Sequence, residues 1–300
     1  MEQARILVVD DDSTIRAMLT EFLSERYSVT SVSSGLAALD VLETQKFDLV
    51  LSDINMPGIN GFETVRRIRA RHGVAQKIAL ITDYSVDSYI KMALDENITN
   101  IIVKNAPFQV DELYRTVDNL LTGRRVFGIE NYLLPDTKIE KFRIRSSEEI
   151  EAVREKLIEM VASTSLFASR AHTIRMIFEE ISSNALYHAY GYKKFERVQL
   201  LDNQVVEVYF GKDERKLGFS VLDHSGNLTK EIVLRKILRA MSQDGILDTD
   251  GRGLFLTRSF SDRFIINIRP REKTEIIVIN HFDSKDDEGV NKPLYINEMS

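Results

Sequence analysis

The chain has 300 residues, 43% of them hydrophobic, with a net charge of −6 and no cysteine. This length is typical of two domains, and the acidic balance argues against a nucleic-acid partner, which needs a basic face. Without cysteine there are no disulfides or thiolate metal sites. The sequence shows no signal-peptide pattern and no apolar run of about 20 residues, so we expect a cytoplasmic protein with no membrane partner.

The first 122 residues alternate short apolar runs with amphipathic helices. A first strand, ILVV, is followed by apolar residues at helical spacing, among them Ile15, Leu19 and Leu23. Further strands are expected at 28–32, 49–51, 77–81 and 101–103, and a last helix over about 110–121. This rhythm predicts a doubly wound parallel sheet, which is an α/β fold.

Polar residues stand where four of these strands end: Asp10 and Asp11, then Asp53, Thr82 and Lys104. Strand ends of an open parallel sheet converge on one edge, where ligands bind. Three carboxylates brought together repel one another and need a cation, and Mg²⁺ with a phosphate suits them. One carboxylate can then act as a nucleophile and form an aspartyl phosphate.

This order, with the turn Asn55-Met56-Pro57-Gly58 and with Gly61 before the next helix, resembles the receiver domain of two-component response regulators. The resemblance implies a flavodoxin-like fold over residues 1–122. It makes Asp53 the phosphoacceptor, and Asp10, Asp11, Asp53 and the backbone carbonyl of Asn55 the Mg²⁺ ligands. Thr82 and Lys104 would bind the phosphoryl group.

The chain departs from the receiver pattern at three places. Asn105 and Ala106 stand between Lys104 and the proline that usually follows it directly. Asp83 follows Thr82, where a small residue is usual, and adds negative charge near the phosphoryl site. Ile101 stands three places before Lys104, where receiver domains commonly have an aromatic residue. The usual coupling between Thr82 and that aromatic residue is therefore in question.

Residues 123–137 read as a connector whose apolar residues should pack on a domain or on a second chain. The following half mixes strands and helices without strict alternation, which indicates an α+β fold. We expect a strand at 138–145, helices at 146–160, 170–190 and 230–241, and strands at 205–210, 217–222, 264–268 and 275–280. Residues 283–300 form an acidic tail in which KPLYI could pair as an edge strand.

A second set of polar residues lies in this half. Glu180, Asn184 and His188 are spaced four apart on the predicted helix 170–190, so they share a face. A carboxylate beside an asparagine oxygen suits Mg²⁺ with phosphates, although a solvated polar face is an equal alternative.

Asp223 ends a strand and could accept a hydrogen bond from an adenine amino group. Gly251 and Gly253 open a helix, where the backbone can approach a phosphate.

The stretch EEISSNALYHAY resembles the asparagine box of the GHKL ATPases, and its nearest branch is the anti-sigma-factor serine kinases. GRGLFLTRSFSDRF with Lys273-Thr274-Glu275 resembles that branch's second glycine box and closing strand. The resemblance implies a GHKL α/β sandwich over residues 138–282 that binds Mg²⁺-ATP. Glu180 would be the general base and Asn184 would hold Mg²⁺. The nucleotide would contact His188, Asp223, Gly226, Gly251, Arg252, Gly253 and Thr274.

This half also departs from its family pattern. Ser225 and Asn227 replace glycines of the first glycine box, with Gly226 between them. Thr249 stands where the serine kinases often carry an arginine that reaches the γ-phosphate, and Arg252 could substitute for it.

Two output functions therefore stay open. In the first, phosphorylation of Asp53 by a cognate sensor histidine kinase controls an ATP-dependent serine/threonine kinase of the anti-sigma-factor type. Its partner would be a sigma factor or an anti-sigma-factor antagonist-like protein, and the chain itself could form a homodimer. In the second, the ATPase fold is a phosphorylation-gated binding module without catalysis. A histidine kinase is a third idea, but His172 lies only twelve residues before Asn184, which leaves no room for a dimerising hairpin.

Overall fold

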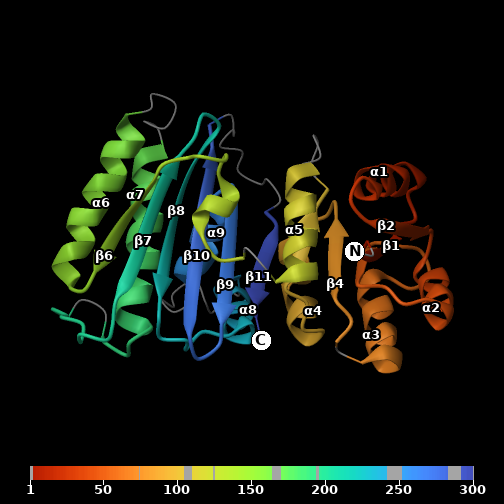
Figure 1. Cartoon of the computed structure of the whole chain (residues 1–300). Coiled ribbons are helices and arrows are strands. Elements are labelled where there is room, and N and C mark those ends of the chain that lie inside the picture. Colours follow the sequence, from red (N-terminus) through yellow and green to blue (C-terminus); the bar gives the residue numbers. More distant parts are fainter. Residues whose placement is uncertain are drawn as a thin grey trace. The chain divides into compact units, whose positions relative to one another are not determined.

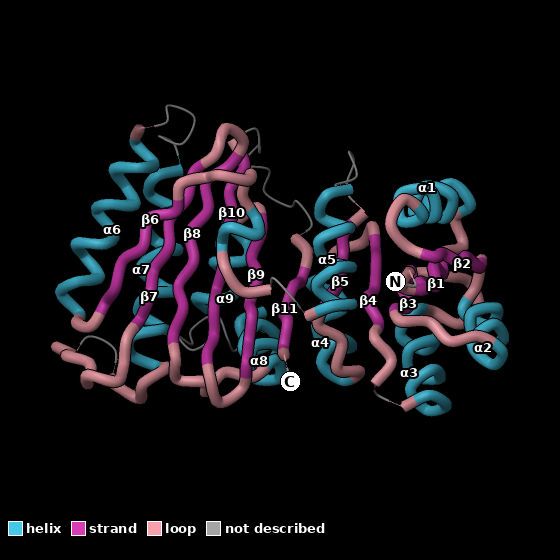
Figure 2. Tube along the Cα trace, viewed as in Figure 1, coloured by secondary structure: helices cyan, strands magenta, loops and turns pink. Residues whose placement is uncertain are grey.

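The computed structural model describes residues 3–73, 75–104, 110–123, 126–163, 170–193, 196–241, 252–282 and 292–299, with only the backbone of Arg252. The chain forms two compact units, Met1–Arg124 and Arg125–Ser300. Figures 1 and 2 show the elements of each unit along the chain.

The first unit has one parallel sheet in the order β2-β1-β3-β4-β5. The strands alternate with helices, which confirms the doubly wound α/β fold predicted from the sequence. The elements are β1 (Arg5–Val9), α1 (Ser13–Ser24), β2 (Ser28–Val32), α2 (Gly35–Thr44), β3 (Leu49–Asp53), α3 (Gly61–His72), β4 (Ile78–Thr82), the 3₁₀ turn η1 (Val86–Tyr89), α4 (Ile90–Asp95), β5 (Asn100–Val103) and α5 (Val110–Thr122).

Local chemistry fixes where the helices of this unit begin. Asp12 accepts hydrogen bonds from the backbone N–H groups of Thr14 at 2.7 Å and Ile15 at 3.0 Å, and so caps α1. Strands β3 and β4 are buried throughout, as expected for strands covered on both faces. The polar residues at their ends are thereby carried to one edge of the sheet.

The second unit has a mixed sheet in the order β11-β9-β10-β8-β7-β6, antiparallel except that β11 runs parallel to β9. This confirms the mixed α and β composition predicted for this half. The elements are the 3₁₀ turn η2 (Ile129–Tyr132), β6 (Ile139–Ile144), α6 (Ser147–Ala162), α7 (Ala171–Ser183), the π-helical turn η4 (Asn184–His188), β7 (Val206–Lys212), β8 (Lys216–Asp223), α8 (Lys230–Met241), α9 (Arg252–Phe260), β9 (Arg263–Arg269), β10 (Lys273–His281) and β11 (Leu294–Glu298).

The two faces of this sheet have different coverings. On one face α7 packs its Phe178 edge-on against Phe210 of β7 and Phe219 of β8, with ring centroids 5.9 and 6.0 Å apart. The connector lies on the other face, where a Cβ added at Gly218 of β8 would meet the side chains of Ile279 and of Ile129 in the connector. In Figure 1 the connector, yellow-green, crosses in front of the strands. The apolar connector residues therefore belong to the core of the second unit.

The structure corrects one expectation for this unit and confirms another that the sequence left open. The helix expected at 170–190 is α-helical only to Ser183, because η4 continues it with wider turns in which Ala189 N–H donates to Asn184 C=O at 3.1 Å. Residues 294–298, left open as an edge within the acidic tail, form β11 of the sheet. Across the described residues, every helix is too short or too polar to cross a bilayer.

Candidate functional sites

Three aspartates meet at the edge of the first sheet. Asp10 and Asp53 are buried, at 0% and 3% exposure, whereas Asp11 is exposed. One carboxylate oxygen from each lies within 4.8 Å of the others. Asp10 also accepts a hydrogen bond from the backbone N–H of Asp12 at 3.0 Å, which orients its carboxylate. This trio of hard oxygen ligands could hold a divalent cation such as Mg²⁺.

Lys104 balances part of this charge. Its ammonium lies 2.9 Å from Asp10 Oδ2 and 2.9 Å from Asp53 Oδ1, and its side chain is 10% exposed. Burial raises the pKa of Asp10 and of Asp53, and Lys104 offsets only part of that effect. Burial alone would lower the pKa of Lys104, but its bonds to both carboxylates outweigh it and raise that pKa. One ammonium among three carboxylates leaves room for a further cation.

Asn55 links this edge to the segment that follows β4. Its side-chain oxygen accepts hydrogen bonds from the Thr82 hydroxyl at 3.2 Å and from the Tyr89 hydroxyl at 2.9 Å. The Thr82 hydroxyl in turn accepts from the backbone N–H of Tyr84 at 3.0 Å. Thr82 is fully buried. The side chain of Asn55 therefore connects the threonine at the end of β4 to η1.

In the second unit α7 and η4 carry Glu180, Asn184 and His188. The Asn184 amide nitrogen donates to Glu180 Oε1 at 3.0 Å, so the amide oxygen is the atom left for a cation. His188 is exposed and is the last residue of the π-helical turn, so it does not continue the Glu180–Asn184 spacing as a straight α-helix would. A π-helical turn inserted in an α-helix is frequent at functional sites.

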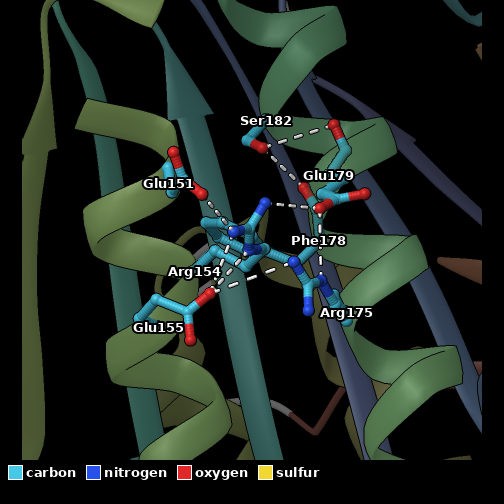
Figure 3. A network of polar contacts seen from close by, with 7 residues as sticks. All are labelled: Glu151, Arg154, Glu155, Arg175, Phe178, Glu179 and Ser182. Atoms are coloured by element: carbon cyan, nitrogen blue, oxygen red, sulfur yellow. Dashed lines mark hydrogen bonds and ion pairs between the residues drawn. The ribbon is translucent and has the colours of Figure 1, made fainter. Parts of the chain in front are cut away.

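The position of α7 is fixed by a buried arginine on α6. Arg154 is 9% exposed and its guanidinium lies 2.6 Å from Glu179 of α7, 3.0 Å from Glu151 and 2.9 Å from Glu155. Figure 3 shows these carboxylates arranged around the guanidinium, with Arg175 reaching the same Glu179 from one turn earlier on α7. The network joins the two helices at the residue next to Glu180.

Gly253 of α9 lies directly against Glu180. A Cβ added at Gly253 would collide with the Glu180 carboxylate, so a larger residue there would push that side chain aside. Gly251, Thr249 and the side chain of Arg252, all singled out in the sequence, lie outside the described residues, as do Asn105 and Ala106 of the first unit.

Asp223 and Thr274 form a second buried pair on the helix-covered face of this sheet. They are cross-strand partners in the antiparallel register of β8 and β10, at 7% and 2% exposure. The Thr274 hydroxyl is a buried group without a hydrogen-bond partner among the described residues. Burial raises the pKa of Asp223, and hydrogen bonds from Ser225 offset this in part. A carboxylate beside an unsatisfied hydroxyl could recognise a planar ligand with donors and acceptors at its edge.

The loop after β8 is held by its own side chains. The Ser225 hydroxyl donates to Asp223 Oδ1 at 2.6 Å, and the Asn227 amide donates to the carbonyl of Ala189 at 2.8 Å. Gly226 has φ +63° and lies against the backbone of Arg271 and Glu272, so its glycine is required. Residues Ser225–Asn227 therefore form a fixed turn that links the end of β8 to Ala189, directly after η4.

Two family models match the chain. The response regulator receiver domain matches residues 6–118, and the histidine kinase-like ATPase domain matches residues 145–279. The chain joins a receiver domain to a histidine kinase-like ATPase domain. The matches place the aspartate cluster in the receiver domain, and the Glu180–Asn184 and Asp223–Thr274 pairs in the ATPase domain.

Known relatives cover the receiver domain. Over 123 residues the chain is 32% identical to the DNA-binding transcriptional regulator NtrC of Klebsiella pneumoniae, covering 41% of this chain and 26% of that protein. It is 35% identical over 118 residues to the response regulator ArlR of Staphylococcus haemolyticus, covering 39% and 52%. The chain thus spans between about a quarter and about half the length of these relatives. A crystal structure of the response regulator TrrA of Thermotoga maritima with Mg²⁺-BeF is 38% identical, covers 40% of this chain and 100% of that one, and has a TM-score of 0.36.

Sequence reasoning missed the role of Tyr89 and a buried polar group on β9 and β10. Nothing in the local sequence points to Tyr89, because its contact with Asn55 spans 34 residues. Asn267 and Glu275 did leave a signal, since Asn267 interrupts the apolar strand RFIINIR, Glu275 directly precedes the apolar run of KTEIIVINH, and both are nevertheless buried. A polar residue kept inside such a strand needs a hydrogen-bonding partner.

Proposed function

We propose that this protein is a signal-transduction regulator in which phosphorylation of Asp53 in the receiver domain controls nucleotide binding by the ATPase domain. The observation that carries the proposal is the Lys104 ammonium 2.9 Å from both Asp10 and Asp53, inside a cluster of three carboxylates. That arrangement suits a nucleophilic carboxylate that must receive an anionic phosphoryl group.

Each receiver residue has a role in this proposal. Asp10, Asp11, Asp53 and the backbone carbonyl of Asn55 would hold Mg²⁺, and three clustered oxygen ligands with excess negative charge fit that ion. The bound ion would neutralise charge between the carboxylates and a phosphate. Asp53 supplies the nucleophilic oxygen, Lys104 pairs with the phosphoryl oxygens, and the Thr82 hydroxyl donates to one of them. Phosphorylation adds a charge of about −1.5 to −2 at this edge.

In the ATPase domain the buried pair would read the nucleotide base. Asp223 accepts from the adenine amino group and the unsatisfied Thr274 hydroxyl supplies a further contact. Asn184 offers its amide oxygen to Mg²⁺, and Gly226, Gly251, Arg252 and Gly253 would lie along the phosphates, with His188 at the exposed end of η4.

For the output reaction we propose a serine/threonine kinase of the anti-sigma-factor type. Glu180 would take the proton of the substrate hydroxyl. Two neighbours that contact its carboxylate support this role, the Asn184 amide at 3.0 Å and the close backbone of Gly253.

A second candidate is a non-catalytic, phosphorylation-gated binding module. The fixed turn at Ser225–Asn227 favours it, because the Ser225 hydroxyl already occupies one oxygen of Asp223 and Asn227 is committed to Ala189. A module of this kind would bind its partner through the ATPase domain and turn ATP over slowly or not at all.

We propose partners for both domains. Receiver domains interact with sensor histidine kinases, and we propose a cognate one as the phosphoryl donor. The output partner would be a sigma factor or an anti-sigma-factor antagonist-like protein with a phosphorylatable serine, and the protein could act as a homodimer.

The first experiment is calorimetric titration of Mg²⁺-ATP into the full chain, with and without beryllofluoride as a mimic of phosphorylated Asp53. We expect binding whose affinity changes with beryllofluoride, and no such change in Asp53→Asn. Asp83→Asn is the matched control, because Asp83 is an exposed aspartate next to Thr82. Binding of Mg²⁺-ATP that beryllofluoride leaves unchanged in the unmodified chain would refute the coupling, and no binding at all would refute nucleotide recognition.

A further inference from the structure

A buried polar group joins the connector to the ATPase domain. Glu275 of β10 is 2% exposed and accepts a hydrogen bond from the backbone N–H of Gly128 at 2.8 Å. Asn267 of β9, fully buried, donates to the carbonyl of Val126 at 2.6 Å. Burial raises the pKa of Glu275, and the Gly128 bond counteracts it. A buried carboxyl and a buried amide are thus both satisfied by connector backbone, which holds the connector firmly to the sheet.

The same group holds the last strand. Asn297 of β11 donates to the Asn267 side-chain oxygen at 2.9 Å, so Asn267 binds the connector with one end of its amide and β11 with the other. Residues Val126, Gly128 and Asn297 lie outside the ranges matched by the two family models. We name Asn267, Glu275 and Asn297 the anchor cluster.

The phenyl ring of Phe127 adds a second contact between connector and sheet. It lies 4.4 Å from the Lys273 ammonium and 5.6 Å from the Arg269 guanidinium, at the end of the β9–β10 hairpin. Cations over an aromatic ring attract it, most strongly where water is excluded. Three consecutive connector residues, Val126 to Gly128, are therefore held by β9 and β10.

The connector attachment is adjacent to the proposed nucleotide site along β10. Side chains alternate between the faces of a strand, so Glu275 points to the connector and Thr274 points to the opposite face, across from Asp223. If the connector shifts and pulls on Glu275, the peptide group between Thr274 and Glu275 must turn or move. The connector contact at Glu275 and the proposed base contact at Thr274 are thus adjacent residues of β10.

A second path runs from β11 to α9. Arg258 of α9 is 2% exposed and donates to the carbonyls of Lys292 and of Pro293, the latter at 3.2 Å, immediately before β11. The same helix carries Gly253 against Glu180. The segment 292–297 is therefore bound to β9 through Asn297 and to α9 through Arg258, and α9 is the helix that contacts Glu180.

We infer that the anchor cluster is a positioning device through which the connector sets the geometry of the nucleotide site, by way of Thr274 on β10 and Gly253 on α9. The inference rests on the proposed nucleotide-binding function of the ATPase domain. By reciprocity, nucleotide that binds better to one connector arrangement must also stabilise that arrangement.

The test uses the full chain with Asn267→Ala and with Glu275→Met, whose side chain is of similar length but offers Gly128 no oxygen. Ile265→Val is the matched control, since Ile265 is buried two residues from Asn267 on β9 and the change removes one methylene without touching a hydrogen bond. Two quantities are measured: Mg²⁺-ATP affinity by calorimetry, and amide hydrogen exchange in residues 126–134, 273–276 and 252–260. Exchange in β6 and β7 reports whether the variants remain folded.

We expect faster amide exchange at residues 126–134 and 273–276 in both cluster variants than in the control. We also expect both variants to bind Mg²⁺-ATP at least about fivefold more weakly than the control, which is the lower end of the usual coupling between two sites. Faster connector exchange with unchanged exchange at 273–276 and unchanged ATP affinity would overturn the inference, and so would an unchanged connector. If the unmodified chain binds no ATP, the proposed function fails, and exchange at 273–276 and 252–260 alone decides the inference.

Discussion

Gly253 of α9 lies against the Glu180 carboxylate of α7 with no room for even one added carbon atom. The atoms in the way are the end of a side chain, which can rotate aside. We therefore expect Gly253→Ala to displace the Glu180 carboxylate while changing the free energy of unfolding by less than about 1 kcal/mol, the usual size of a glycine-to-alanine change in a helix. ATP turnover or phosphoryl transfer should fall about as far as in Glu180→Gln.

The measurement for this pair is turnover of Mg²⁺-ATP in the two single variants and in the double variant. If both changes act on the same carboxylate, the double variant should be no worse than Glu180→Gln alone. Additive losses would show that Gly253 acts independently of Glu180.

Lys104 is the cation that two buried carboxylates share in the receiver domain. Lys104→Met should destabilise this domain by about 3–5 kcal/mol when Mg²⁺ is absent, because it leaves both carboxylates without their partner. Added Mg²⁺ should recover part of the loss. Hydrogen exchange of the β1 and β3 amides, measured with and without Mg²⁺, checks this in the full chain.

The double variant Asp53→Asn with Lys104→Met supplies the control. Removing one of the two carboxylates should reduce the cost of losing the ammonium. A double variant less stable than Lys104→Met would contradict this account of the charge balance.

Asp223 gives the ATPase domain a pH dependence with a definite sign. Its pKa in the folded protein is raised above 3.8 by burial, so its contribution to stability is complete below pH 3.8 and is lost as the pH rises through the raised pKa. The amide introduced by Asp223→Asn cannot ionise and still offers Ser225 an oxygen, so this variant should gain stability over the unmodified chain as the pH rises. Urea unfolding from about pH 4 to 8 measures the difference.

The same variant should bind Mg²⁺-ATP about tenfold more weakly, a loss equivalent to about 1.4 kcal/mol, because an amide is a poorer acceptor for the adenine amino group. A stability difference that shrinks with rising pH would contradict the raised pKa. ATP affinity equal to that of the unmodified chain would remove Asp223 from base recognition.

Tyr89 links the η1 turn to the side chain of Asn55. Tyr89→Phe removes the 2.9 Å bond to Asn55 while keeping the ring that lies 5.8 Å from Phe62, and should cost about 1 kcal/mol. We expect beryllofluoride to slow amide exchange in η1 and α4 of the unmodified chain, and to do so less in the variant. Equal protection in both proteins would show that Tyr89 does not transmit the change at Thr82.

The strand-end cluster of the receiver domain was predictable because parallel strands present their ends at one edge whatever the side-chain packing. Asp10, Asp53 and Lys104 therefore meet as their positions along the sequence indicate. The bond between Tyr89 and Asn55 was not predictable, since it depends on how η1 folds over that edge. The π-helical turn at Asn184 was missed for a related reason: an α-helix pattern carries no signal for one widened turn.

In the ATPase domain the sequence located Asp223 and Thr274 correctly at strand ends, and the register of β8 and β10 then placed them opposite each other. The anchor cluster needed tertiary information, because its partners are connector backbone groups. Backbone atoms are the same at every residue, so no pattern of side chains could reveal which of them Asn267 and Glu275 would bind.

The placement of β11 has a consequence for synthesis on the ribosome. The receiver sheet is complete once residue 103 has emerged, whereas the second sheet lacks its strand beside β9 until residues 294–298 have emerged, about 200 residues later. At roughly 5–20 residues per second this interval is about 10–40 seconds. Strand β9 ends at Arg269, so its edge is open only during the last part of that interval, but a nascent chain still completes the proposed phosphorylation site well before the proposed nucleotide site.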